Sequence, residues 1–224
     1  MTRLSIVMPV LDEGAGLAQT LLALQPLRRR GHELIVVDGG SQDGSVALAQ
    51  AGADHILHSA RGRALQMNAG AAQAQGDVLL FLHADTRLPA GADGLIDAAL
   101  RGGALWGRFD VEIVGASRLL PLVAWCMNAR SRLTAICTGD QALFVQRSLF
   151  AQLGGYAELP LMEDIELSRR LRTRAPPACL RQRVQTSGRR WDRRGAWRTV
   201  WLMWQLRWCY WRGAAPEALA RRYR

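Results

Sequence analysis

The chain has 224 residues, 49% of them hydrophobic, which is enough to bury the core of one domain. All 29 basic residues are arginine. The lack of lysine excludes P-loop and Schiff-base enzymes and disfavours sugar nucleotidyltransferases, which usually rely on lysines. Residues 1–168 carry 13 Arg against 17 Asp and Glu, whereas residues 169–224 carry 16 Arg against two acidic residues, giving a net charge of +10. This basic tail predicts an anionic partner, with a solvated arginine-rich face as the alternative.

Composition also bears on location. No run of 18 or more apolar residues is present, so the sequence predicts no membrane-spanning helix. The apolar run near the N-terminus is too short for a signal peptide, and acidic residues follow it at once. The four cysteines form no CxxC pair, which favours reduced thiols over zinc or disulfides. We therefore expect a cytoplasmic protein.

Strands and helices alternate along the first part of the chain. Strands are predicted at 4–10, 33–37, 54–58 and 78–82, and helices at 16–30, from 45, and at 63–75. This alternation is typical of βαβ units and predicts an α/β fold with a mostly parallel sheet and flanking helices. Further on we expect helices at 90–100, 118–136, from 163 and at 196–212, and strands at 106–114, 141–145 and 180–185. The pattern at 106–114 indicates a half-exposed strand, and the helix at 118–136 is apolar but carries Arg118, Arg130 and Arg132.

The stretch at 77–86, DVLLFLHADT, is the centre of this pattern. Its apolar run predicts a strand buried on both faces, which ends in His83, Ala84 and Asp85. Ligands of open α/β sheets bind outside the carboxyl ends of the strands. Asp85 is therefore a candidate ligand for a divalent metal ion, with a carboxylate that caps the next segment as the alternative. Asp38 and two further aspartates lie at the ends of other predicted elements of the same sheet, namely Asp140 and Asp164.

The last predicted helix carries five tryptophans at steps of four and three, so they line one face: Trp197, Trp201, Trp204, Trp208 and Trp211. Arg198, Gln205 and Arg212 lie on the opposite side. Such a stripe suits a membrane–water interface with anionic head groups, or packing on the rest of the protein or on a second subunit. Both interpretations stay open.

Five stretches resemble family 2 glycosyltransferases with the GT-A fold, in particular the small bacterial "transferase 2, rSAM/selenodomain-associated" type. They are SIVMPVLDEG, ELIVVDGGSQDGS, GRALQMNAGAAQAQGDVLLFLHADT, GDQALFV and MEDIELSRRL, and they span nearly the whole chain. The resemblance implies a Rossmann-like GT-A domain over 1–190, followed by a basic, tryptophan-rich helical appendage over 191–224. It also implies a UDP- or GDP-sugar donor, a divalent metal ion (Mn²⁺ or Mg²⁺), and transfer with inversion to a sugar or lipid acceptor.

The resemblance assigns the donor-binding residues. Asp38 matches the aspartate that holds the nucleotide base, although Gly39 stands where many relatives have a second aspartate. Glu13 matches an acidic residue near the nucleoside. The remaining donor-binding residues that the resemblance implies are Pro9, Arg63, Gln66, Asn68, His83, Ala84 and Asp85. For Asn68, the alternative is a hydrogen bond to the backbone of its own helix.

The resemblance also assigns the reacting groups. Asp85 matches the last aspartate of the DxD motif and would hold the metal ion. His83 replaces the first aspartate, and we favour a noncovalent polar role for it over metal ligation. Asp164 matches the general base, with compensation of a helix dipole as the alternative. The acceptor side would include Asp140, Gln141 and Glu163, and Arg190 would contact the diphosphate.

An inverting, metal-dependent glycosyltransferase is therefore the favoured function, with peripheral association at the inner membrane left open. The alternative is a non-catalytic module that binds a nucleotide sugar or anionic lipid on a GT-A scaffold. Binding of nucleic acid by the tail rests on charge alone, so we expect no nucleic-acid partner. A dinucleotide-binding dehydrogenase is excluded because Gln19 stands where the third glycine of its motif belongs.

Overall fold

The computed structural model describes residues 2–223 and is built on an eight-stranded sheet with the strand order β3-β2-β1-β4-β7-β6-β8-β5. Four neighbouring strands run parallel: β1 (Leu4–Val10), β2 (Glu33–Asp38), β3 (His55–His58) and β4 (Val78–Phe81). Beyond β4 the sheet becomes mixed: β7 (Phe144–Gln146) is antiparallel to both neighbours, β6 (Trp106–Val114) runs parallel to β8 (Ala178–Ser187), and β5 (Thr86–Arg87) is antiparallel to β8. The predicted α/β class with a mostly parallel sheet is confirmed.

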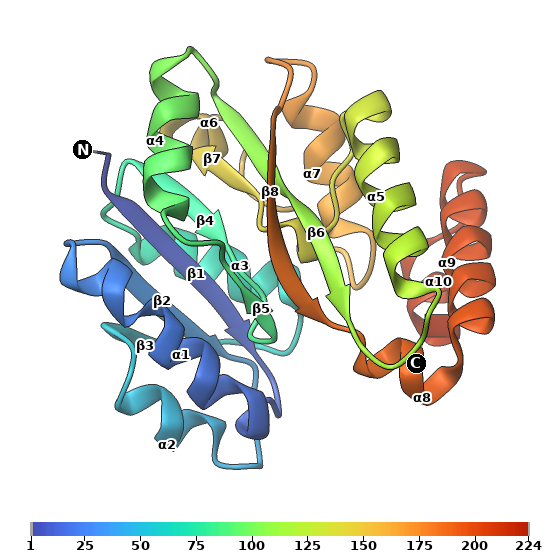
Figure 1. Ribbon diagram of the computed structural model, residues 1–224, viewed down its shortest axis with the longest axis horizontal. Coiled ribbons are helices and arrows are strands. Elements are labelled where there is room, and N and C mark those ends of the chain that lie inside the picture. Colours follow the sequence, from blue (N-terminus) through green and yellow to red (C-terminus); the bar gives the residue numbers. More distant parts are fainter. Residues whose placement is uncertain (1, 224) are drawn as a thin grey trace.

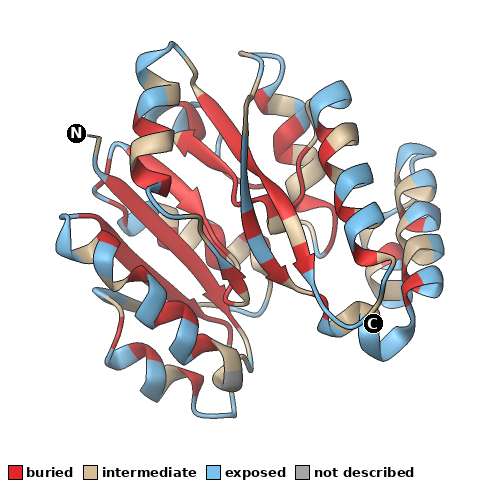
Figure 2. Cartoon of the chain, viewed as in Figure 1, coloured by how far each residue is buried: buried red, intermediate tan, exposed pale blue. Residues whose placement is uncertain are grey.

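Helices cover both faces of the sheet (Figure 1). One apolar core contains side chains of α1 (Gly14–Arg29), α4 (Ala92–Arg101) and α5 (Leu120–Thr134). The opposite core contains side chains of α3 (Arg63–Gln73), α6 (Arg147–Gln152) and α7 (Glu163–Leu171). The short α2 (Ser45–Gln50) lies beside α1. β1, β2 and β4 are buried along their whole length, as Figure 2 shows, which fits their largely apolar sequence, whereas the edge strand β3 is partly exposed.

Gly70 lets α3 lie close to the sheet. A Cβ atom on this residue would lie 2.4 Å from Cγ1 of Val7 and 3.0 Å from Cγ2 of Val37. Any larger side chain would push the helix outward. The packing matters for function because α3 begins with Arg63, at the end of the sheet where β1 and β2 stop.

Two expectations about the strands need correction. The predicted strand at 141–145 is instead a 3-10 turn, Gly139–Gln141, followed by β7 three residues later than expected. β6 is buried rather than half-exposed, and Arg108 in it is only 1% exposed. Its charge is satisfied by Asp110, which also accepts two hydrogen bonds from Arg132 of α5. Arg108 and Asp110, two of the polar residues of β6, therefore form an ion pair inside the protein instead of facing solvent.

The C-terminal segment forms three helices, α8 (Arg189–Arg194), α9 (Ala196–Trp211) and α10 (Pro216–Tyr223), beside α5 (Figure 1). Leu206 of α9 packs with Leu219 of α10 and with Leu161 and Met162, which precede α7. The tryptophan stripe lies on the other side of α9, and its five side chains are 59–73% exposed. The stripe therefore does not pack on the rest of this chain. No helix within residues 2–223 is both long and apolar enough to cross a bilayer.

Candidate active site

Asp38 ends β2 and shapes the loop that follows it. Its carboxylate accepts hydrogen bonds from the backbone of Gly40 (2.9 Å) and Ser41 (3.1 Å), and His58 lies 3.4 Å away. Burial alone would raise the pKa of Asp38, but the hydrogen bonds from Ser41 and Gly40 lower it. Asp38 is thus an ionised group at the carboxyl edge of the sheet, where the sequence predicted it.

Three predicted donor-binding residues have structural tasks in this arrangement. Gln66 is buried, and its side-chain nitrogen donates to the carbonyls of Val10 (2.9 Å) and Val37 (2.8 Å), which ties β1 to β2. Asn68 exchanges two hydrogen bonds with the backbone of Tyr156. The alternative for Asn68 was a hydrogen bond to the backbone of its own helix; it does bind backbone, but that of Tyr156 in another segment. Pro9 is buried inside β1.

Asp85 and Glu13 share an arginine that the sequence analysis did not single out. Arg189, the first residue of α8, forms an ion pair with Glu13 and lies 3.5 Å from the carboxylate of Asp85. Glu13 follows β1 and Asp85 follows β4, so the Arg189 guanidinium bridges the ends of two strands on the side of the sheet where the donor is predicted to bind. The only signal in the sequence was the Arg189-Arg190 pair that follows the last strand. Ala84, between His83 and Asp85, is buried and its carbonyl accepts from Thr20 (2.6 Å).

His83 lies against the turn that carries Asp140. Its Nδ1 atom is 3.4 Å from the Asp140 carboxylate. Burial opposes a charge on the ring, but Asp140 raises the pKa of His83. A Cβ atom on Gly139 would lie 2.5 Å from this ring, so a glycine is required where the two segments meet. The contact favours a polar role for His83 toward Asp140.

Arg63 is surrounded by the acidic residues of the site. Its Nε atom lies 3.4 Å from the carboxylate of Glu163, the first residue of α7. Burial alone would lower the pKa of Arg63, but nearby carboxylates raise it; they belong to Glu163, Asp164, Asp140 and Asp85. Acidic side chains from the ends of three separate segments are therefore gathered around one guanidinium.

Asp164, the second residue of α7, is half-buried and is the candidate base of this cluster. Burial and the adjacent charge of Glu163 raise its pKa to about 6. Its oxygens accept hydrogen bonds from the backbone of Gly139 (3.0 Å) and Ile165 (2.7 Å), which fix the orientation of the carboxylate. The residue just before this pair, Met162, has a left-handed backbone (φ 71°) and anchors the turn in the core beneath α9. A carboxyl group with a pKa near neutrality in a cleft suits a general base.

Gln141, assigned to the acceptor, and Arg190, assigned to the diphosphate, both have partners within the protein. Gln141 is fully buried and bonds to Ser131 (3.1 Å) and to the backbone of Thr138, so it holds the turn below the site rather than facing an acceptor. Arg190 stacks on the ring of Tyr223 at 4.0 Å. Burial lowers the pKa of Arg190, and the charge of Asp140 acts in the opposite direction.

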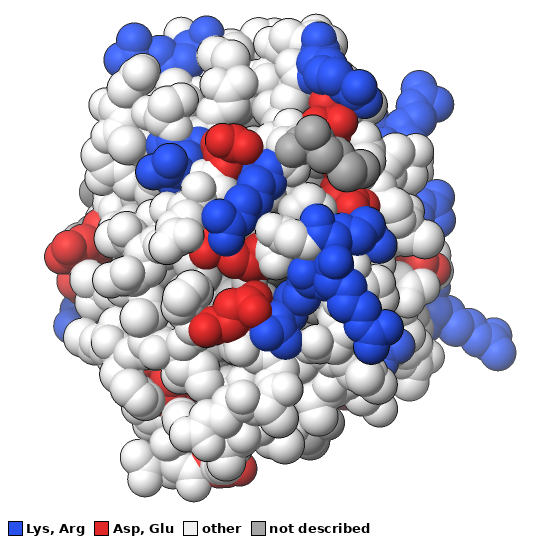
Figure 3. Space-filling model, turned by 90° about the vertical axis from the view of Figure 1, so that its left-hand side faces the viewer, with Lys and Arg blue, Asp and Glu red and all other residues white. Residues whose placement is uncertain are grey.

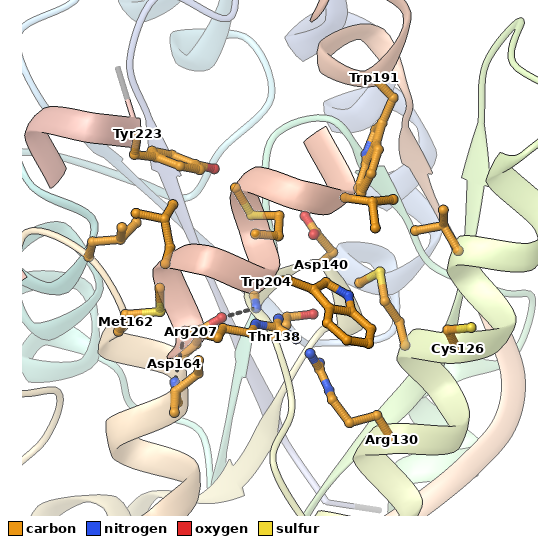
Figure 4. A pocket seen from close by; sticks show the side chains of 18 of the residues that line it. Cys126, Arg130, Thr138, Asp140, Met162, Asp164, Trp191, Trp204, Arg207 and Tyr223 are labelled. Carbon is orange, nitrogen blue, oxygen red and sulfur yellow. Dashed lines mark hydrogen bonds between the residues drawn. The ribbon is translucent and has the colours of Figure 1, made fainter. Parts of the chain in front are cut away.

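A pocket of about 730 Å³ opens beside this cluster, between α5 and α9. Its lining contains Asp164, Asp140 and Arg63 together with many apolar side chains of the two helices. Figure 4 shows Arg130 reaching from α5 toward the ring of Trp204, with Asp164 on the far side of the same space. This pocket could not be found from the sequence, because its walls are segments more than 60 residues apart.

The residues fit a divalent metal only in part. Among residues 2–223, no three side chains of His, Cys, Asp or Glu come together as a metal cage. Asp85 offers one carboxylate at the strand end. Mg²⁺ and similar ions are commonly held by one or two carboxylates together with phosphates of the substrate. The donor set therefore suits an ion that arrives with a diphosphate rather than one held by protein alone.

The mostly parallel sheet flanked by helices, with Asp38 and Asp85 after two of its strands and an acidic pair at the start of α7, matches the GT-A class of fold. Solved structures agree. The structure of TarS from S. aureus in complex with UDP-GlcNAc superimposes with a TM-score of 0.64 at 16% identity, covering 83% of this chain and 58% of that one. The mannosyltransferase PcManGT from Pyrobaculum calidifontis, in complex with GDP-Man and Mn²⁺, gives a TM-score of 0.61 at 18% identity, covering 82% and 56%.

Residues 5–115 match the family model described as Glycosyl transferase family 2, and this part of the chain belongs to that family. An uncharacterized glycosyltransferase from Mycobacterium tuberculosis is 34% identical over 152 residues, which are 63% of this chain and 57% of that protein. The chain thus spans little more than half the length of this curated relative. The expected likeness to family 2 glycosyltransferases is confirmed over residues 5–115 and the GT-A fold by the solved structures, whereas the rSAM-associated subtype stays a prediction.

Proposed function

We propose that the chain is an inverting glycosyltransferase that moves a sugar from a UDP- or GDP-sugar to a hydroxyl acceptor. The observation that carries this proposal is the position of Arg63 among Asp85, Asp140, Glu163 and Asp164. Arg63 and the candidate base Asp164 both line the pocket, and the charge of Asp85 acts on Arg63, which supports this assignment. The solved neighbours that bind UDP-GlcNAc and GDP-Man support this class of donor.

Each group then has a chemical task. Asp164 takes the proton of the acceptor hydroxyl while the hydroxyl oxygen attacks the anomeric carbon opposite the leaving group. Arg189 and Arg190 neutralise the diphosphate, for which Arg189 leaves its ion pair with Glu13. Asp85 would hold a divalent ion, which supplies further neutralisation of the leaving group. Glu13 and Asp38 bind the nucleoside.

The direct experiment is a screen of UDP- and GDP-sugars for release of the nucleoside diphosphate. We expect release from one donor, stimulated by Mn²⁺ or Mg²⁺ and by a hydroxyl acceptor. Binding of a donor without any release, at every metal and acceptor tested, would instead favour the non-catalytic module.

The rate of transfer should depend on pH through Asp164. A base acts only in its ionised form, and the pKa of Asp164 is raised to about 6. We therefore expect kcat/KM to be constant above pH 7 and to fall about tenfold per unit below pH 6. A profile measured between pH 4.5 and 8.5 checks this. An unchanged rate at pH 5 would rule out Asp164 as the base.

We also propose that the appendage over 191–224, which contains α9 and α10, docks the GT-A domain (1–190) on an anionic membrane surface, consistent with a location at the inner membrane. Exposed apolar residues of α5 flank the tryptophan stripe across the pocket: Leu122, Trp125 and Leu133. The tail is strongly basic. On the N-terminal side of the molecule, in contrast, arginines lie beside acidic side chains (Figure 3).

Co-sedimentation with vesicles tests this docking. The double variant Trp201→Ser/Trp211→Ser should bind anionic vesicles about tenfold more weakly than the parent chain. Leu22→Ser is the matched control, because Leu22 is equally exposed but lies on α1, away from the stripe. Equal partition of the parent chain and the double variant would contradict the proposal.

A further inference from the structure

The pocket between α5 and α9 has two chemically different parts. Its outer walls are apolar and include Val123 and Met127 of α5 and Val200 and Met203 of α9. It also contains charged groups of both signs, among them Arg130 and Asp164. The other charged residues of the lining are Arg63, Asp140, Glu163 and Arg207. The volume, about 730 Å³, lies within the range of about 300–1,000 Å³ that is usual for small-molecule sites. A ligand that fills it must therefore combine a long apolar part with a polar end.

Arg130 determines the charge of that polar end. Among the described residues, its Nε and Nη2 atoms are buried and have no hydrogen-bond partner. These two atoms form one edge of the guanidinium, which is the edge that pairs with two oxygens of a carboxylate or phosphate. Burial lowers the pKa of Arg130, and the nearest opposite charge is that of Asp164. Arg130 is only half-buried and lines the pocket, but two buried N–H donors without a partner are costly. An anionic group that reaches this edge from the pocket would offset that cost.

The contrast with the other arginine of α5 is informative. Arg132 lies only two residues away and uses both terminal nitrogens on Asp110. Arg130 has no such partner, although it faces a cavity that already contains the candidate base. We propose that the acceptor is an amphiphile whose hydrocarbon chain lies between α5 and α9 and whose phosphate or carboxylate binds Arg130, next to the hydroxyl that faces Asp164. The inference rests on the proposed transferase function.

The transfer step is then balanced. The hydroxyl oxygen of the amphiphile forms a bond to the anomeric carbon, its proton moves to Asp164, and the nucleoside diphosphate leaves with the electrons of the broken glycosyl bond. The hydrocarbon chain runs outward toward the exposed tryptophans of α9, so the acceptor can be taken from a lipid surface.

Binding of simple amphiphiles tests the inference without any donor. The fluorescence of the four tryptophans in the pocket lining, Trp191, Trp197, Trp204 and Trp208, reports binding. Decyl phosphate or decanoate should bind at least a hundredfold more tightly than propyl phosphate, because each buried methylene group tightens binding about fourfold. Decanol should bind more weakly than the better of the two anions, and the comparison of those anions identifies the head group.

Variants separate the pocket from the surface. Arg130→Met should weaken binding of the preferred anion about 10- to 100-fold, and Arg198→Met, an exposed residue of α9 outside the pocket, should not change it. Val123→Trp should fill the groove and remove the preference for the long chain. Thermal unfolding of Arg130→Met gives a second readout: Tm should stay the same or rise, since no internal ion pair is lost.

The outcomes are distinct. Equal binding of decyl and propyl phosphate would overturn the inference. It would also be overturned if Arg130→Met and Val123→Trp left binding unchanged while Trp201→Ser weakened it. That pattern would indicate adsorption of the amphiphile on the tryptophan stripe. Titration of UDP and GDP with Mn²⁺ on the same preparations tests the transferase function separately. If a nucleotide binds but the amphiphiles show no chain-length preference, only the inference of an amphiphilic acceptor fails and the transferase function stands.

Discussion

Asp164→Asn is expected to lower the rate of sugar transfer by about 10²–10⁴-fold while UDP or GDP still binds as in the parent chain. The amide can still accept the hydrogen bond that the backbone of Gly139 donates to Asp164, so the turn should keep its shape. The substitution removes the charge and the capacity to take a proton, together with the hydrogen bond from the backbone of Ile165, which an amide nitrogen cannot accept. Comparison of kcat with the nucleotide affinity, measured by titration, separates the two effects.

Glu158→Gln is the matched control for this substitution. Glu158 lies in the segment just before α7, and Asp164 lies in the first turn of that helix. Glu158 is exposed, however, and takes no part in the cluster around Arg63. Its rate should equal that of the parent chain. A loss in Asp164→Asn of less than about tenfold, with the protein folded, would mean that another group removes the proton.

Asp85→Asn should lower transfer by about 10²–10³-fold and, unlike Asp164→Asn, should also remove the effect of Mn²⁺ on nucleotide binding. The amide has no charge with which to hold a cation against the diphosphate. It also removes one of the two carboxylates that attract Arg189 and leaves Glu13 as its remaining acidic partner in this site. Titration of UDP and GDP with and without Mn²⁺ measures both consequences.

Asp77→Asn is the control from the same strand. Asp77 is exposed at the other end of β4, where its side chain accepts a hydrogen bond from the backbone of Arg3. Its substitution should leave the nucleotide and metal titrations unchanged. If Asp85→Asn behaved like Asp77→Asn, the strand end would not be the site of the diphosphate.

Local patterns predicted much of this fold. The leucines at helical spacing in α1 and the short apolar runs of β1, β2 and β4 are dictated by burial on one or two faces, which the sequence displays directly. The rule that parallel strands end at one edge then brought Asp38 and Asp85 to the same side. Asp164 could be assigned because the resemblance supplied a role for the acidic pair that opens α7.

Contacts between distant segments could not be predicted in this way. The alternation in β6 indicated a half-exposed strand, because nothing local shows that Asp110 neutralises Arg108 inside the protein. Gln141 and Gln66 have polar side chains suited to a ligand, yet the backbone and side chains of other segments bind them. Arg189 and the free edge of Arg130 become meaningful only once α8 and α9 lie against the domain.

Titration of the folded chain with UDP and GDP, in the presence and absence of Mn²⁺, tests the account most directly. The account predicts that one nucleotide binds, that Mn²⁺ tightens its binding, and that Asp85→Asn loses the metal effect while Asp164→Asn retains it. Failure of both nucleotides to bind at millimolar concentration, with metal present and the protein folded, would contradict it.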